Sequence, residues 1–165
     1  MATIKRVLGA PTLMTITLAS LANAAGRVGT QIDFTSASGS GLTNQAVLIS
    51  YRFRVGSVAP TANSTVQFFW ARSVSGVSDG NLAATDTGYT SSSLPFSASQ
   101  LRDQLQYCYS QPVIATTSLD YRGSFIVFDP GPKGSLYVYN DIGQALDSTG
   151  TNFTITYQTI DFDVS

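Results

Sequence analysis

The sequence predicts an all-β protein: a single-domain antiparallel β-sandwich of jelly-roll type. Residues 47–55 (VLISYRFRV) alternate apolar and polar positions with a period of two, which is typical of a strand with one buried face. All ten acidic residues are Asp, so Glu, a good helix former, is absent, whereas strand-favouring Thr and turn-favouring Ser are abundant. The length of 165 residues fits one ordinary domain.

The first 24 residues have roughly the layout of a secretory signal peptide. Lys5 and Arg6 precede an apolar stretch that ends in the small-residue triplet 22–24. However, Pro11 and several hydroxyl residues interrupt this stretch, and residues 14–18 alternate apolar side chains with Thr. That period is typical of a strand and not of a helical signal core. We therefore expect the segment to be retained, with residues 22–24 forming a turn after the first strand.

This interpretation divides the chain into an N-terminal arm, residues 1–11, and a sandwich domain, residues 12–165. A secreted adhesin remains an alternative only if the opening segment is cleaved. The next strand after residues 47–55 is predicted at Thr65–Arg72, with the single tryptophan, Trp70, facing the core. Residues 73–93 are rich in Ser, Gly, Thr and Asp, and they predict a long surface loop with room for one short strand.

The second half of the chain predicts one helix and several strands. Residues 97–109 contain Leu101 and Leu105 four positions apart and Ser97 or Ser99 as a cap, although QYCYSQPV also favours an extended conformation. In the final run, residues 153–164, the apolar positions are odd up to Tyr157 and even from Ile160. We expect a bulge or a change of sheet near Gln158 and Thr159. Strands are also predicted at residues 112–118, 123–128 and 135–140, with a turn at Asp129–Gly134.

The composition excludes most catalytic and metal chemistry. No histidine is present, which removes Ser-His-Asp and Cys-His triads, and one cysteine, Cys108, forms neither an intramolecular disulfide nor a Cys-rich zinc site. Asp161 and Asp163 are interpreted as solubilising charges on the wet side of a strand. Loop residues Asp79, Asp86 and Asp147 are weak calcium candidates, because the EF-hand spacing is absent. We therefore predict no enzyme, no catalytic residue, no metal and no cofactor.

Charge and hydropathy constrain the partners. The net charge of −1 is not that of a general nucleic-acid binder, and no run of 18 apolar residues predicts a membrane span. Arg52 and Arg54 share one strand face, with Arg72 as a candidate third member, and this face is interpreted as solvated or as a protein contact. Seven of the eight tyrosines leave stacking on sugar rings open as an alternative: Tyr51, Tyr107, Tyr109, Tyr121, Tyr137, Tyr139 and Tyr157.

Three stretches resemble a family of small virion proteins of tailed bacteriophages. They are TITLASLANAAGRVGTQID (Thr15–Asp33), TANSTVQFFWARS (Thr61–Ser73) and IGQALDSTGTNFTITYQTID (Ile142–Asp161), and they occur in the order found in the family. The resemblance implies a jelly-roll-type sandwich that acts as a capsid cement, or decoration, protein. Such a protein binds the assembled phage head and stabilises it, because it binds the assembled state only. A tail or fibre protein that binds a receptor or carbohydrate is the alternative.

The resemblance also implies partners and a location. The expected partners are the major capsid protein and further copies of the chain, as a trimer or dimer, with no nucleic acid and no membrane. The chain would be made in the host cytoplasm and would lie on the outer surface of the capsid. The arm is too apolar to be a free tail, so we expect residues 2–14 to contact the capsid or a neighbouring protomer. The residues that we expect to make these contacts are Lys5, Arg6, Val7, Leu8, Arg52 and Arg54.

Overall fold

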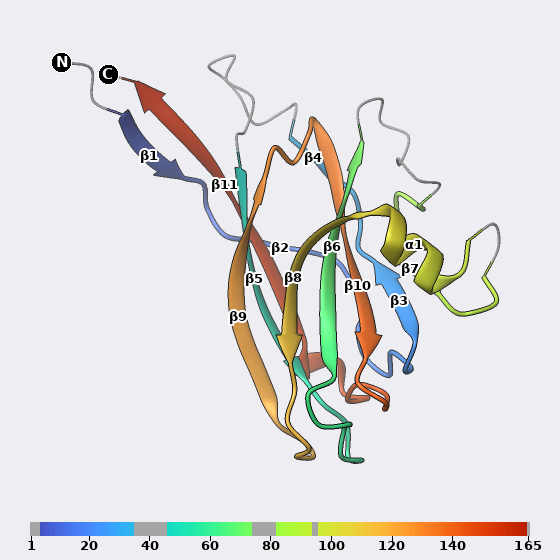
Figure 1. Cartoon of the computed structure of the whole chain (residues 1–165). Coiled ribbons are helices and arrows are strands. Elements are labelled where there is room, and N and C mark those ends of the chain that lie inside the picture. The colour runs from blue at the N-terminus through green and yellow to red at the C-terminus, as the bar shows by residue number, and fades with distance from the viewer. Residues whose placement is uncertain (1–3, 35–45, 74–81, 94–95, 165) are drawn as a thin grey trace.

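The fold is two antiparallel β-sheets packed face to face, as the computed structural model of the chain shows (Figure 1). The structure describes residues 4–34, 46–73, 82–93 and 96–164. The prediction of an all-β sandwich is confirmed. Within the described residues no helix is long and apolar enough to cross a membrane.

The first sheet, sheet A, contains the strand that the sequence predicted most clearly. Its strand order is β1 (Ile4–Leu8), β11 (Thr154–Val164), β5 (Ala46–Arg54) and β9 (Asp120–Phe128), and β2 (Thr12–Leu13) also pairs with β11. The alternation read in β5 is real: its residues are buried at odd positions and half-buried at the even positions from 48 onward. The odd positions of β5 face the second sheet, so the even positions define the outer face of sheet A.

The second sheet, sheet B, is covered on both faces. Its order is β7 (Thr87–Tyr89), β3 (Ala25–Val28), β10 (Lys133–Asp141), β6 (Thr65–Ser73) and β8 (Gln106–Pro112), and β4 (Ile32–Asp33) pairs with β10. In the central strand β10 every residue from Gly134 to Asn140 is buried. Continuous burial of this kind requires a second layer on the outer face of sheet B.

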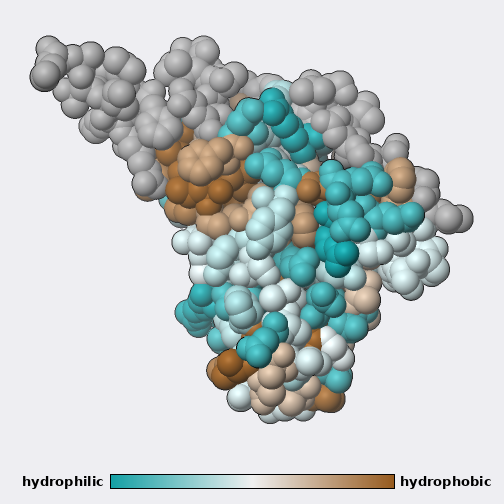
Figure 2. Space-filling view, in the orientation of Figure 1, coloured by the Kyte–Doolittle hydropathy of each residue, from teal (hydrophilic) through white to brown (hydrophobic). Residues whose placement is uncertain are grey.

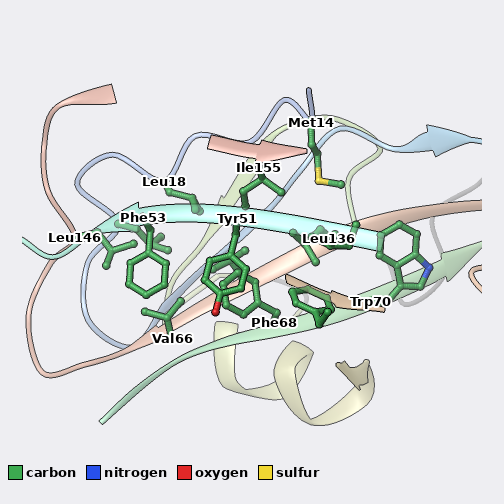
Figure 3. Close-up of a cluster of buried hydrophobic side chains, with 14 of the residues drawn as sticks. Met14, Leu18, Tyr51, Phe53, Val66, Phe68, Trp70, Leu136, Leu146 and Ile155 are labelled. Carbon is green, nitrogen blue, oxygen red and sulfur yellow. The ribbon is translucent and has the colours of Figure 1, made fainter. Parts of the chain in front are cut away.

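An aromatic cluster fills the space between the sheets (Figure 3). Phe68 of β6 is fully buried, and its ring centroid lies 4.7 Å from that of Tyr51 and 5.3 Å from that of Phe125. Trp70 also faces this core, as predicted, and its indole Nε1 donates a hydrogen bond to the Pro130 carbonyl at 2.9 Å. These contacts join both sheets, since Tyr51 and Phe125 belong to sheet A.

Helix α1 (Ala98–Gln104) forms the layer over the outer face of sheet B. Ser97 is its N-cap, in a reciprocal capping box with Gln100, so the capping prediction is confirmed. Ala98 and Leu101 are buried against sheet B, and the Tyr137 hydroxyl donates to the Ala98 carbonyl at 2.9 Å. The helix ends before Leu105, where the backbone is extended and leads into β8, so the extended alternative holds for residues 106–112.

Three sequence predictions need correction. Residues 112–118 do not form a strand, because β8 ends at Pro112 and the chain then turns. The segment at 14–18 buries Met14 and Leu18 as its alternation suggests, yet the strand there covers only Thr12–Leu13. β11 itself has no bulge and no change of sheet near Thr159, because its register with β5 is unbroken from Thr154 to Ile160. The apolar positions change parity because the outer face of sheet A becomes apolar there.

Two predicted turns and a short strand are present. Residues 23–24 form a turn before β3, with Ala24 at φ 56°, as expected for the small-residue triplet. The β9–β10 connection turns at Asp129–Pro132, with Gly131 at φ 77°. The long loop contains β7 in its described part. A short 3-10 helix, η3 (Gly150–Asn152), precedes β11.

Candidate interaction surface

The outer face of sheet A carries an apolar row at the end from which β1 projects. The register places Leu8 opposite Ile160, Ile160 opposite Ala46, and Ala46 opposite Phe128, so the row crosses β1, β11, β5 and β9. Ile160 and Ala46 are buried within it, whereas Leu8 and Phe128 are 47% and 67% exposed. The row thus has two buried residues in its middle and one exposed residue at each end.

The next row on the same face widens this surface. Leu48 stands opposite Gln158 and Ile126, and Ile126 is 37% exposed. Figure 2 shows a brown, hydrophobic patch where the ribbon of β1 and β11 leaves the sandwich. Adjacent exposed apolar side chains of this kind mark interaction sites on protein surfaces. We call the set Leu8, Ala46, Leu48, Ile126, Phe128 and Ile160 the apolar row.

Arginines occupy the other end of the same face. Arg52 donates from Nε and Nη2 to Oδ2 of Asp120 at 3.2 and 2.9 Å, and Arg54 Nε lies 3.5 Å from Oδ1 of the same carboxylate. Arg122 Nη2 is 3.9 Å from Asp120 Oδ2, and its side chain is 70% exposed. Three guanidinium groups therefore share one carboxylate, and Arg122 is the most exposed of them. We call Arg52, Arg54, Arg122 and Asp120 the arginine cluster.

The predicted contact residues divide between these two regions. Lys5, Arg6, Val7 and Leu8 all lie in β1, while Arg52 and Arg54 lie in β5 at the opposite end of sheet A. Arg72 does not join them, because it belongs to sheet B and pairs with Asp129 at 2.6 Å. Val7 is 42% exposed. It stands opposite Asp161, so its side chain lies on the opposite face of the β1–β11 ribbon from that of Leu8.

Sequence reasoning missed half of this surface. Phe128, Ile126 and Arg122 lie on β9, whose outer positions become visible only when the register with β5 is known. The change of parity at Ile160 was the one signal in the sequence that an outer face turns apolar. From the sequence it indicates a bulge or a change of sheet, because one strand alone does not show which neighbours continue the row.

The loop aspartates are used in local structure. Asp86 accepts hydrogen bonds from Arg27 Nε, the Thr17 hydroxyl and the Thr17 amide. Burial by itself would raise the pKa of Asp86, but these donors hold it below its ordinary value. Asp147 accepts from the Thr149 amide at 2.7 Å, which lowers its pKa. Asp79 lies outside the described residues. Among the residues that the structure describes, no group of three or more His, Cys, Asp or Glu side chains lies close enough together to hold a metal ion.

The interpretation of Asp161 as a wet surface charge is wrong in part. Its side chain is only half exposed, and its Oδ1 is a buried oxygen without a hydrogen-bond partner. The cause is its position opposite Val7 in the β1–β11 ribbon, on the parity of the inner face. For Asp163 nothing beyond its backbone register opposite Lys5 is described.

Most of the tyrosines are part of the core and do not form a sugar platform. Tyr51, Tyr137 and Tyr139 are buried, and the Tyr51 hydroxyl donates to Gln111 Oε1 at 2.6 Å. Tyr107 is 59% exposed, with its ring edge-on to Phe69 at 5.7 Å between centroids. The other three in the predicted set, Tyr109, Tyr121 and Tyr157, are half-buried against the core between the sheets.

A shallow pocket lies near the arginine cluster, between the loop at 56–58 and residues 144–148. Its lining is mostly polar, and Asp147 is its titratable side chain. That carboxylate already accepts hydrogen bonds from Thr149 and Asn152. These bonds favour its ionised form and lower its pKa, which does not suit a general acid or base near neutral pH.

Comparison with known proteins identifies no relative. No family model matches the chain, and neither a curated protein nor a solved structure matches it.

Proposed function

We propose that this chain is a structural protein of a tailed-bacteriophage virion, a cement protein that docks on the assembled head and stabilises it. One observation carries the proposal: β1 and the end of β11 form a two-stranded ribbon that projects from the sandwich (Figure 1). Pairing of β11 with β5 stops at Ile160, and from residue 161 to Val164 the paired neighbour of β11 is β1.

A two-stranded ribbon is only marginally stable in water, and it gains stability from a further strand or a packed surface. Gly9 donates its amide to the Thr159 carbonyl at 2.9 Å, which fixes the hydrogen-bonding parity of this edge. Because amides alternate in direction along an antiparallel strand, those of Leu8, Arg6 and Ile4 point away from β11. The ribbon thus offers a strand edge with which a neighbouring protein can pair.

The rest of the edge is blunted. Pro11 interrupts it, and the register with β11 shifts by one residue between Gly9 and Leu13. Devices of this kind prevent unwanted pairing along an edge strand. Along this edge of sheet A the exposed pairing stretch is therefore confined to β1, in the part of the chain for which we expect capsid or protomer contact. This arrangement supports a docking role and needs no catalytic group.

Deletion of residues 2–11 tests the proposal. The truncated chain should keep its sandwich, measured by the near-ultraviolet signal of Trp70 and by a cooperative unfolding transition, and it should no longer bind heads assembled without the protein. Heads that lack the protein should also lose DNA on heating or at low salt. Truncated chain that binds as well as the full chain would contradict the docking role of β1, and heads equally robust without the protein would contradict the cement role.

Immunogold labelling of intact particles distinguishes the alternative location. We expect label over the whole head surface. Label confined to the tail would replace the cement role by that of a tail or fibre protein that binds a receptor.

A further inference from the structure

The outer face of sheet A has two different ends, and this asymmetry restricts what can cover it. The apolar row lies at the end nearest β1, and the arginine cluster lies six to eight residues further along β5. At roughly 3.3 Å per residue the two are about 20 to 26 Å apart. Between them the face carries hydroxyl side chains, Ser50, Ser124 and Thr156. One partner of ordinary interface size can touch both ends.

We propose that this outer face docks on an acidic protein surface that offers an apolar anchor site for Phe128 and carboxylates for the arginine cluster. The proposal rests on the proposed function, since the surface would belong to the head, and it adds the chemistry of that surface. Phe128 is the anchor because it is the largest exposed side chain in the row, stands opposite buried Ala46 and has the partly exposed Ile126 two residues away on the same strand. Exposed aromatic side chains that become buried in a pocket of the partner are common among the residues that dominate interface affinity.

Charge selects the partner. Asp120 is one carboxylate for three guanidinium groups, and Asp147 near Arg54 adds a second negative charge, so the three cations still outnumber the carboxylates beside them. Arg122 is the cation with the weakest pairing, at 3.9 Å from Asp120. The face therefore carries a local positive excess on a chain whose net charge is −1. Carboxylates on a partner would complete the ion pairing of Arg122, and they would add a charged acceptor for Arg54, whose Nε donates to the Ser118 carbonyl at 2.9 Å.

A second copy of the chain fits this face less well. Two copies packed face to face over their full length in opposite directions would bury the arginine cluster of each against the apolar row of the other, which is costly for unpaired charges. Packed in the same direction, they would oppose arginine with arginine. A nucleic acid is also disfavoured, because its phosphate backbone requires a broad basic surface and here the excess is confined to one end of one sheet.

Two pairs of matched variants test the inference by binding to purified heads assembled without the protein. Arg122→Gln changes the charge of the outer face by −1, and Gln104→Glu makes the same change at an exposed position of α1, the helix that covers the other sheet. Phe128→Ser removes the anchor, and Ile114→Ser removes an equally apolar side chain, 57% exposed, from a loop. We expect roughly tenfold weaker binding for Arg122→Gln and for Phe128→Ser, and unchanged binding for the two controls.

Salt identifies the electrostatic part. An increase from 0.05 to 0.5 M NaCl should weaken wild-type binding and remove most of the difference between wild type and Arg122→Gln, while the effect of Phe128→Ser should persist. Equal binding of all variants would overturn the inference and leave the proposed function in place. Wild-type chain that binds no heads would overturn the proposed function itself. A wild-type dimer that Phe128→Ser dissociates, or duplex DNA bound through Arg122, would also overturn the acidic protein partner.

Discussion

The Arg27 Nε donates a hydrogen bond to Asp86 Oδ1 at 2.5 Å. The hydroxyl and the amide of Thr17 donate to the same carboxylate, so Asp86 joins three segments of the chain. Arg27 lies in β3, and Asp86 immediately precedes β7, which pairs with β3 at the edge of sheet B. Thr17 belongs to the segment that follows β2. This carboxylate therefore fixes how the first part of the chain crosses from sheet A to sheet B.

Loss of this carboxylate should destabilise the protein. The Arg27 and Asp86 side chains are 27% and 15% exposed, so Asp86→Ala leaves a largely buried guanidinium and two Thr17 donors without their acceptor. We expect a decrease of about 2 kcal/mol in the free energy of unfolding, measured by urea denaturation. The control is Asp103→Ala, whose carboxylate is 64% exposed and pairs with its neighbour Arg102. It should cost less than about 0.5 kcal/mol. Equal effects of the two substitutions would contradict this role.

The same carboxylate predicts an acid dependence of stability. The pKa of Asp86 is lower in the folded protein than its ordinary value of 3.8, so the unfolded chain binds the proton more readily. The stabilisation is complete above about pH 4 and is lost as the pH falls through the folded pKa. Urea midpoints measured from pH 6 to pH 2.5 should fall less steeply for Asp86→Asn than for wild type. Parallel curves would show that Asp86 does not contribute to the acid dependence of stability.

The sequence was sufficient to predict a two-sheet sandwich, but it did not show that the outer face of sheet B is also buried, under the layer that contains α1. The alternation in β5 reports burial against sheet B directly, because one face of that strand is dry and the other is partly wet. In β6 the same reasoning placed Trp70 in the core but missed that Phe69 and Ala71 are also buried, by the layer that contains α1. A strand that is buried on both faces is apolar at successive positions, so it lacks the alternation of apolar and polar residues that identifies a buried face.

The candidate surface was only half predictable for a related reason. Contact through residues 2–14 is predicted because this segment is too apolar to be a free tail, although the sequence does not predict the strand at Ile4–Leu8. The apolar row was not predicted, because it is formed by one or two residues from each of four strands. In the sequence Phe128 is simply the last residue of a strand, and only the register with β5 shows that it stands opposite Ala46 on the outer face.

The single cysteine should be chemically inert in the folded protein. Burial raises the pKa of Cys108 to about 12, against an ordinary value of 9.0. Because the thiolate is the reactive form, its fraction at pH 8 is roughly 10⁻⁴, compared with about a tenth in the unfolded chain. Reaction with the aromatic disulfide DTNB should therefore be about 100-fold slower, or more, in buffer than in 8 M urea. Similar rates in the two conditions would mean that the thiol is not shielded by β8 and the core.

The close approach of β10 to Trp70 should make Gly134 intolerant of a side chain. A Cβ at this position would overlap the indole ring of Trp70, which lies on the neighbouring strand β6, opposite Leu136 and diagonal to Gly134. The ring has little freedom to move, since it is 1% exposed and its Nε1 is bonded to Pro130. Gly134→Ala should cost about 1–3 kcal/mol in the free energy of unfolding and shift the Trp70 fluorescence. Gly150→Ala is the matched control: nothing lies within 4 Å of its Cβ position, so its stability should stay within about 0.5 kcal/mol of wild type. If Gly134→Ala were as stable as the control, the tight contact between β10 and the indole would be refuted.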